Sequence, residues 1–380
     1  MQTTRIRLAS RSASAAFSMS LCSLSLCAFG LASLVPACVK PVTAPAAGGM
    51  TPAAAEEPPP PPKKDEKKDE PETPVVPRQK GENIFTGVKW WLDPYSNATL
   101  AMKRLKAANN MEESSLIAKI AEYGGADWIG DWTPNVENWV HKRVKLINKN
   151  HAFPLFIAYN IPKRDCGQYS AGGAAKGDAY RLWIAAFARA IGPQRAAVVL
   201  EPDGLGLLKK CLSEADQKER LDLLRFAVHA FGEQKNTAVY IDAGNAGWID
   251  PPEMAARLKG AGVDDAEGFA LNVSNYKTTD ATIKYGKEIS KRLGGKHFVI
   301  DTSRNGKGPP DVKGDVEAAW CNPSGRGLGT PPTTKTADPL VDAYLWLKKP
   351  GESDGECNGG PKAGMWWHAK ALELAKNASF

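Results

Sequence analysis

The stretch Ala196-Ala-Val-Val-Leu-Glu-Pro-Asp203 joins an apolar run of five residues to two carboxylates. Two other apolar runs, at 153–158 and 237–241, also end near a carboxylate, Asp165 after the first and Asp242 after the second. Short apolar runs of this kind are typical of buried strands, and helical stretches separate them. The order strand, helix, strand, helix predicts a parallel barrel or a doubly wound sheet, whose strand carboxyl ends meet at one face.

Acidic side chains gathered at such a face indicate acid and base chemistry. A fourth carboxylate, Asp354, stands in the segment Pro350-Gly-Glu-Ser-Asp-Gly355. The chain also has 11 tryptophans, whose flat rings can stack on the apolar faces of sugars. Several carboxylates with many aromatic rings indicate acid and base chemistry on a sugar. The alternative role for each aspartate is to cap a helix at a strand-to-helix loop.

Seven segments in sequence order resemble glycoside hydrolase family 6, the cellulases also called family B. They are Tyr159-Asn-Ile-Pro-Lys-Arg-Asp-Cys166, Val198-Val-Leu-Glu-Pro-Asp203, Asp242-Ala-Gly-Asn-Ala-Gly-Trp248, Leu271-Asn-Val-Ser-Asn-Tyr276, Ile300-Asp-Thr-Ser-Arg-Asn-Gly306, Trp320-Cys-Asn-Pro-Ser-Gly325 and Leu345-Trp-Leu-Lys-Lys-Pro-Gly-Glu-Ser-Asp-Gly355. The resemblance covers roughly residues 84–380. It implies an α/β fold, a distorted, TIM-like barrel of seven parallel strands, in a single catalytic domain at 83–380.

The expected elements follow the apolar periodicity of this domain. We expect strands near 84–91, 153–160, 196–201, 237–242, 268–274, 297–301 and 342–348. We expect helices near 99–109, 134–148, 178–191, 213–232, 252–259, 280–293 and 366–376.

The resemblance also implies a role for each carboxylate. Asp203 matches the general acid of the family. Asp165 matches the residue that raises the pKa of this acid and stabilises positive charge on the sugar ring. Asp354 matches the proposed base, with activation of water through Asp165 as the alternative. Asp242 is expected to bind substrate and organise the site, with Arg304 as its candidate partner.

Further positions match sugar contacts of the family. Tyr159 is expected beneath the distorted sugar, and the other expected contacts are Trp128, Trp320, Lys348, Glu352 and Asn275. Two positions depart from the family pattern. Ala171 stands where relatives carry a serine that helps to hold the water, and Asn245 replaces a histidine.

The N-terminal part of the chain is typical of an exported protein. Three arginines precede an uncharged, Leu- and Ala-rich run at about 15–37, which predicts a signal peptide at 1–37. The sequence Leu34-Val-Pro-Ala-Cys38 resembles a bacterial lipobox, so we expect lipidation of Cys38, with ordinary cleavage and secretion as the alternative. The Pro-, Lys- and Glu-rich segment 38–82 is expected to be a disordered linker. The expected location is the cell surface, as an outer-membrane lipoprotein, or the secreted fraction.

Four of the seven cysteines lie in the expected catalytic domain, and an even number in an exported domain predicts two disulfides. Three pairings are possible. The family resemblance implies Cys166 with Cys211 and Cys321 with Cys357. A metal site is not expected, because no two of these cysteines have the close spacing of a zinc site.

The net charge of the chain bears on whether it binds nucleic acid. The formal net charge is +7, and it becomes +4 without the three arginines of the signal peptide. This small, unclustered excess predicts no nucleic-acid partner. The family resemblance implies an inverting endoglucanase that acts on β-1,4-glucan, and we expect it to be monomeric, to need no cofactor and to meet a membrane only through a lipid on Cys38. The alternatives are a cellobiohydrolase, another β-glucan-specific glucanase, or a non-catalytic glycan-binding lipoprotein.

Overall fold

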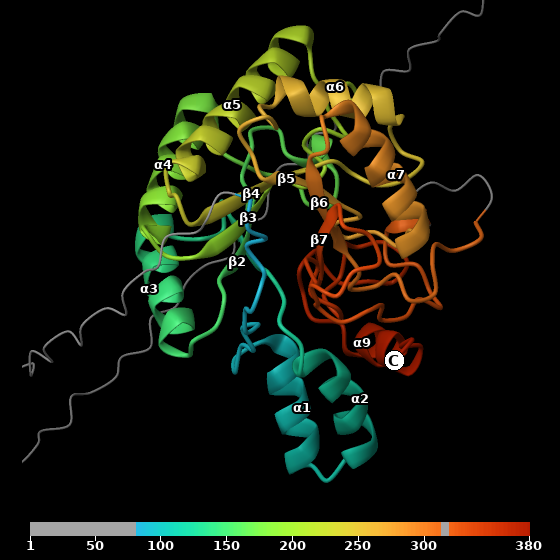
Figure 1. The fold of residues 1–380 in the computed structure, drawn as a ribbon. Coiled ribbons are helices and arrows are strands. Elements are labelled where there is room, and N and C mark those ends of the chain that lie inside the picture. The colour runs from blue at the N-terminus through green and yellow to red at the C-terminus, as the bar shows by residue number, and fades with distance from the viewer. Residues whose placement is uncertain (1–80, 313–318) are drawn as a thin grey trace, which may run out of the picture. The chain divides into compact units, whose positions relative to one another are not determined.

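The computed structural model describes residues 81–312 and 319–380 (Figure 1). The expected signal peptide, Cys38 and nearly all of the expected linker lie outside the described residues. The described chain contains one sheet of seven strands, in which each strand pairs in parallel with the next in sequence. The strands are β1 (Asp127–Gly130), β2 (Leu155–Tyr159), β3 (Ala196–Leu200), β4 (Thr237–Asp242), β5 (Gly268–Leu271), β6 (His297–Asp301) and β7 (Val341–Leu345). This is the expected α/β fold, a parallel sheet curled into a half-barrel.

The strands are apolar because both faces of the sheet are buried. Every residue of β2, β3 and β4 is buried, as is typical of a parallel sheet covered on both sides. On the inner face, Ile157, Val199 and Tyr240 belong to one apolar cluster. On the outer face, Phe156 and Val198 belong to a larger cluster shared with the helices. The alternation along each strand therefore divides the core into a barrel interior and an outer layer.

Helices cover the outer face of the sheet (Figure 1). The α-helices of the described residues are α1 (Asn97–Ala107), α2 (Met111–Ala121), α3 (Val136–Lys149), α4 (Gly177–Ile191), α5 (Glu214–Gly232), α6 (Pro251–Gly260), α7 (Thr279–Arg292) and α9 (His368–Lys376), of which α3 to α7 cover the outer face. Ser213 caps α5 and Thr278 caps α7, each accepting a backbone N–H with its side-chain oxygen. The helices α3 to α7 form the outer layer, whereas α1, α2 and α9 share a separate apolar cluster around Ile117, Trp346 and Leu374.

One expected strand is wrong. Residues 84–91 form no strand, and their only β-type pairing is an isolated bridge between Trp90 and Phe153. This segment is apolar because Ile84 and Phe85 fill the barrel interior, where the Phe85 ring stacks on Tyr240. The seventh strand is β1, which has only four residues between glycines and so shows little periodicity. Helix α2 was also not expected.

The two edge strands of the sheet meet at a narrow seam. The order runs from β1 to β7 without a strand pairing between these two. Just before β1, the Ala126 N–H donates to the Trp346 carbonyl at 3.1 Å, and the Trp128 indole donates to the Leu347 carbonyl at 2.9 Å. Among the described residues, no helix has the length and apolar character needed to cross a membrane.

Candidate active site

The carboxylates singled out from the sequence lie beyond or at the carboxyl ends of four strands. Asp165 follows β2 in a short 3₁₀ turn, Asp165–Gly167, and Asp203 follows β3. Asp242 is the last residue of β4, and Asp354 lies in the segment after β7. Asp165 and Asp203 have φ values of 58° and 66°. Left-handed backbone of this kind is strained for aspartate and is common where a fold aims a functional side chain.

Asp203 and Asp242 form the centre of the site. The Asp203 backbone N–H donates to Asp242 Oδ1 at 2.9 Å, which holds the turn after β3 against the end of β4. Burial raises the pKa of Asp203 well above its usual value, and the negative charge of Asp242 raises it further. Burial also raises the pKa of Asp242, to about 7. Asp203 therefore retains a proton in a pH range where an ordinary aspartate is ionised.

The charges of two further carboxylates act on the same group. Asp165 and Asp354 also raise the pKa of Asp203, which shows that the four expected carboxylates lie close enough to interact. Among these charges, that of Asp242 raises the pKa of Asp203 most. It acts more strongly than the charge of Asp165, to which the family resemblance gave this role.

Asp354 has the opposite electrostatic environment. Its Oδ2 accepts hydrogen bonds from Arg304 Nη1 at 2.9 Å, Tyr276 Oη at 3.2 Å and the Asn322 N–H at 3.0 Å. Lys348 Nζ lies 3.5 Å from Asp354 Oδ1. Burial opposes ionisation of Asp354, but Arg304 and Lys348 together lower its pKa below the usual value. The expected partner of Asp242 is thus wrong, because Arg304 pairs with Asp354.

Asp165 lies at the rim of the site. Its Oδ2 accepts the Ser170 N–H at 2.7 Å, which folds the loop back over the carboxylate. Burial raises the pKa of Asp165, and the Ser170 N–H and the charge of Arg164 only partly oppose this. Asp165 is half-buried, and its Oδ1 accepts a hydrogen bond from Gln168 Nε2 at 3.4 Å.

Tyr159 forms the floor beside these carboxylates. Its ring makes an edge contact with Trp128, with centroids 5.2 Å apart. Arg164 lies 4.5 Å from the Tyr159 ring and 5.1 Å from the Trp132 ring, and pairs with Asp131 at 2.9 Å. Trp128 therefore lies next to Tyr159, and the sugar contact expected of it stays a prediction.

The other expected sugar contacts are distributed around this centre. Lys348 is buried against Asp354 and donates to the Ser353 carbonyl at 3.1 Å. Trp320 is half-buried, 6.2 Å from the Tyr169 ring. Asn275 is half-buried in the loop after β5. Glu352 lines a separate, smaller cavity, where it accepts a hydrogen bond from Asn97 at 3.1 Å.

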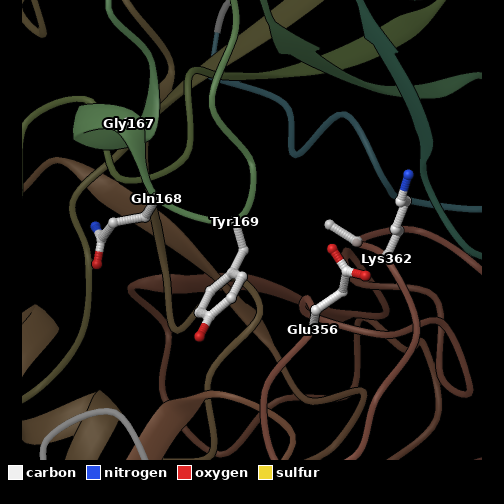
Figure 2. A pocket seen from close by; sticks show the side chains of 6 residues that line it. Gly167, Gln168, Tyr169, Glu356 and Lys362 are labelled. Carbon is white, nitrogen blue, oxygen red and sulfur yellow. The ribbon is translucent and has the colours of Figure 1, made fainter. Parts of the chain in front are cut away.

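Two loops that carry site residues meet each other. A Cβ added to Gly355 would lie 2.4 Å from the Cβ of Tyr169, so the Tyr169 side chain rests directly on this glycine. Figure 2 shows Gln168 and Tyr169 on one side of the cavity and Glu356 and Lys362 on the other; its volume is about 610 Å³. The loop after Asp354 therefore reaches the loop after β2.

Each of these loops is tied by a disulfide. Cys166 pairs with Cys211, and Cys321 pairs with Cys357, as the family resemblance implied. The first disulfide begins one residue after Asp165, and the second ends three residues after Asp354. The loops around the cavity are thus covalently anchored at both sides.

An exposed aromatic residue near the site, here called the platform, was not singled out from the sequence. Trp248 is 37% exposed in the segment after β4. A Cβ added to Gly206 would meet the Trp248 indole at 2.4 Å, and one added to Gly244 would meet it at 3.0 Å. The indole therefore packs against two glycines while part of it stays exposed. The signal was present, because Trp248 ends one of the quoted segments.

Two buried carboxylates at strand ends were missed as well. Glu201 accepts the backbone N–H groups of Asn160 and Ile161 at 2.9–3.0 Å. Asp301 similarly accepts backbone N–H groups from neighbouring loops, including that of Ser274 at 3.0 Å. Both stand within the quoted segments, but nothing in a single sequence separates a loop-holding carboxylate from a reacting one.

These features together define a class of protein. The carboxyl group of Asp203, with a raised pKa, and the carboxylate of Asp354, with a lowered pKa, interact at a single site, so one can keep a proton where the other is ionised. Within the described residues, no cluster of three or more His, Cys, Asp or Glu side chains is arranged to hold a metal ion. The arrangement is that of a carboxylate-dependent hydrolase built on a parallel half-barrel.

Comparison with known families identifies the chain. Residues 85–378 match the family described as glycosyl hydrolases family 6, and the chain belongs to this family. Endoglucanase A of Cellulomonas fimi is 40% identical over 295 residues, which are 76% of this chain and 61% of that protein. The chain thus spans about three-fifths of that relative. Endoglucanase 1 of Streptomyces halstedii is 41% identical over 71% of this chain and 83% of that protein.

A solved structure supports the same assignment. The endoglucanase Cel6 of Mycobacterium tuberculosis, in complex with methyl-cellobiosyl-4-deoxy-4-thio-β-D-cellobioside, superposes with a TM-score of 0.74 at 43% identity. It covers 78% of this chain and 99% of its own. A probable 1,4-β-D-glucan cellobiohydrolase C of Neosartorya fischeri is more distant, at 30% identity over 78% of this chain and 79% of its own length.

Proposed function

We propose that this protein is an endoglucanase that hydrolyses internal β-1,4-glucosidic bonds of cellulose or a related β-glucan with inversion. The observation that carries the proposal is the opposed environment of Asp203 and Asp354 at one site. The relatives named endoglucanase, at 40 to 43% identity, support the endo mode.

In this proposal Asp203 is the general acid. Its raised pKa keeps the carboxyl protonated, so it can donate a proton to the leaving oxygen as the glycosidic bond breaks. Asp354 stays ionised and supplies negative charge on the other side of the sugar. A water molecule attacks the anomeric carbon from the face opposite the leaving group, which gives the α-anomer.

Two carboxylates compete for the role of base. Arg304 and Lys348 lower the proton affinity of Asp354, which makes it a weak base but a strong stabiliser of positive charge on the ring. Asp165 is half-buried and has a raised pKa, which suits transfer of the water proton. Ala171 carries no hydroxyl, so the side chain at this position cannot hold the attacking water.

Substrate binding is assigned to the surrounding residues. Tyr159 and Trp128 offer apolar surface beneath the reacting sugar, Asp242 holds the Asp203 turn, and the platform Trp248 offers a stacking face further along. The other proposed contacts are Trp320, Lys348, Glu352 and Asn275. A monomer exported through the signal peptide and tethered by lipidated Cys38 completes the proposal.

The test is viscometry combined with an assay of reducing ends. An endoglucanase lowers the viscosity of carboxymethylcellulose quickly while few reducing ends appear. Asp203→Asn, prepared in parallel, controls for contaminating activity. If cellobiose accumulates as nearly the sole product while viscosity persists, the enzyme is a cellobiohydrolase. The contact between Tyr169 and Gly355 and the 30% identical cellobiohydrolase favour this as the second candidate.

A further inference from the structure

Asp301 is a buried carboxylate that the proposed mechanism does not use. It is the last residue of β6 and only 1% exposed. Its Oδ1 accepts the N–H groups of Ser303 at 2.9 Å and Leu347 at 3.3 Å. Its Oδ2 accepts those of Ser274 and Lys348, both at 3.0 Å. One side chain thus holds the backbone that follows three adjacent strands, β5, β6 and β7.

These backbone segments carry the two cations that bind Asp354. Lys348 donates its own N–H to Asp301 and places its Nζ 3.5 Å from Asp354 Oδ1. Arg304 lies three residues after Asp301, donates through Nη2 to the Ser274 carbonyl, and binds Asp354 through Nη1 at 2.9 Å. Both cations therefore depend on segments whose positions Asp301 fixes.

Buried carboxylates at the neighbouring strand ends also accept backbone N–H groups from other segments. Asp242 accepts the N–H of Asp203, and Glu201 accepts those of Asn160 and Ile161, the residues that lead from β2 toward Asp165. Hydrogen bonds to a charged acceptor are stronger than neutral ones, and buried ones are poorly replaced by water. Asp301 differs from the other two because it gathers donors from three segments at once.

We propose that Asp301 is a positioning residue for the reaction: it fixes the segments after β5, β6 and β7 so that Lys348 and Arg304 bracket Asp354. The inference rests on the proposed function, in which Asp354 acts as an ionised carboxylate. The groups that face Asp354 are Arg304, Lys348, Tyr276 and, through its charge, Asp203.

The principal variant is Asp301→Asn. Asparagine keeps one acceptor oxygen and places an NH₂ group against two backbone N–H donors. The segment after β5 or the segment after β6 therefore loses its anchor, and the segment after β7 keeps only one of its two hydrogen bonds. We expect kcat on β-1,4-glucan to fall by on the order of 10- to 100-fold, since small displacements of reacting groups have effects of this size. We also expect the acidic limb of the kcat/KM profile to move to higher pH, because Asp354 loses the close support of its cations.

Asp342→Asn is the matched control. Asp342 is another buried carboxylate, in the adjacent strand β7, but it binds Tyr240 Oη at 2.7 Å and His297 Nδ1 at 2.8 Å instead of the loops of the active site. We expect this control to lower the unfolding midpoint while kcat and the pH profile stay at wild-type values. Asp301→Glu keeps the charge and both acceptor oxygens, and we expect it to restore part of kcat; it also serves if Asp301→Asn does not fold.

The outcomes separate the two proposals. A folded Asp301→Asn, or Asp301→Glu in its place, with wild-type kcat and pH profile would overturn the positioning role and leave the proposed function intact. A variant that is only less stable, in the manner of Asp342→Asn, would do the same. If the wild-type protein does not hydrolyse any β-1,4-glucan, the proposed function fails, and the role of Asp301 fails with it. A reduced kcat with a displaced acidic limb, absent from the Asp342 control, supports the role.

Discussion

Replacing Asp242 with asparagine separates the charge of this residue from its shape. Asp242 is 1% exposed, and its Oδ1 accepts the N–H groups of Asp203 at 2.9 Å and Gly244 at 3.1 Å. Asparagine retains this oxygen. The new Nδ2 takes the place of Oδ2, which has no hydrogen-bond partner in the wild-type site. The variant therefore removes a buried negative charge and keeps the hydrogen bonds that hold the Asp203 turn.

The size of the effect follows from the pKa of Asp242, which burial raises from 3.8 to about 7. At 1.36 kcal/mol per pH unit, this difference corresponds to about 4 kcal/mol. A carboxyl group with a raised pKa binds its proton more tightly in the folded state, so the folded protein loses stability as the pH rises from 3.8 through about 7. The loss is about 1 to 2 kcal/mol at pH 5 and about 4 kcal/mol at pH 8. Asp242→Asn has no carboxylate to ionise at this position, so it avoids this loss. Its stability relative to the wild type is therefore about 2 to 3 kcal/mol higher at pH 8 than at pH 5.

The measurement is urea unfolding of both proteins at pH 5 and pH 8, followed by tryptophan fluorescence. Asp250→Asn makes the same chemical change at an exposed position and is expected to leave the pH dependence unaltered. A stability difference between Asp242→Asn and wild type that is the same at both pH values, or smaller at pH 8, would refute the reasoning. In active enzyme, the alkaline limb of the rate profile should also move to lower pH, because Asp242 no longer raises the pKa of Asp203.

Four further outcomes are expected. Asp203→Asn cannot donate a proton, so turnover of unactivated glucan should fall on the order of 100-fold or more; near-normal turnover would show that another group is the acid. Fresh hydrolysate should contain the α-anomer first by proton NMR, and an initial β-anomer would exclude inversion. Trp248→Ala should raise KM for long cello-oligosaccharides about 2- to 10-fold with little change in kcat, and Gly206→Ala, whose Cβ would displace the indole, should act in the same direction; an unchanged KM in both would remove Trp248 from the binding surface. Replacing both Cys166 and Cys211 with serine should lower the free energy of unfolding by about 2 to 5 kcal/mol, and an unaltered urea midpoint would contradict this.

The sheet was largely predictable because buried parallel strands leave a strong apolar signal. The runs that became β2, β3 and β4 are apolar along their whole length, and they were found nearly to the residue. The strand β1 was not, since Asp127–Gly130 is short and Asp127 turns outward to pair with Arg143 at 2.7 Å. The segment at 84–91 was wrongly predicted as a strand, because its apolar side chains fill the barrel interior although its backbone does not pair as a strand.

Within the site, the sequence located the carboxylates but not their partners. Asp165, Asp203, Asp242 and Asp354 each follow or end a strand, so topology brings them to one face. Whether Arg304 binds Asp242 or Asp354 depends on the curl of the sheet and on the path of the loop after β7, which no local pattern encodes. The same limit applies to Asp301, whose importance lies in donors that are up to 47 residues away in sequence.

The two disulfides join loops, and none of the four cysteines lies in a strand or an α-helix of the described structure. Reduction would therefore leave the sheet and its apolar clusters intact, while it would free the segments that carry Asp165 and Asp354. A newly made chain in a reducing compartment would have a folded sheet, but its disulfides would not yet tie the loops that carry Asp165 and Asp354. Oxidation would then tie these loops, so the activity proposed for this protein would depend on where its thiols can pair.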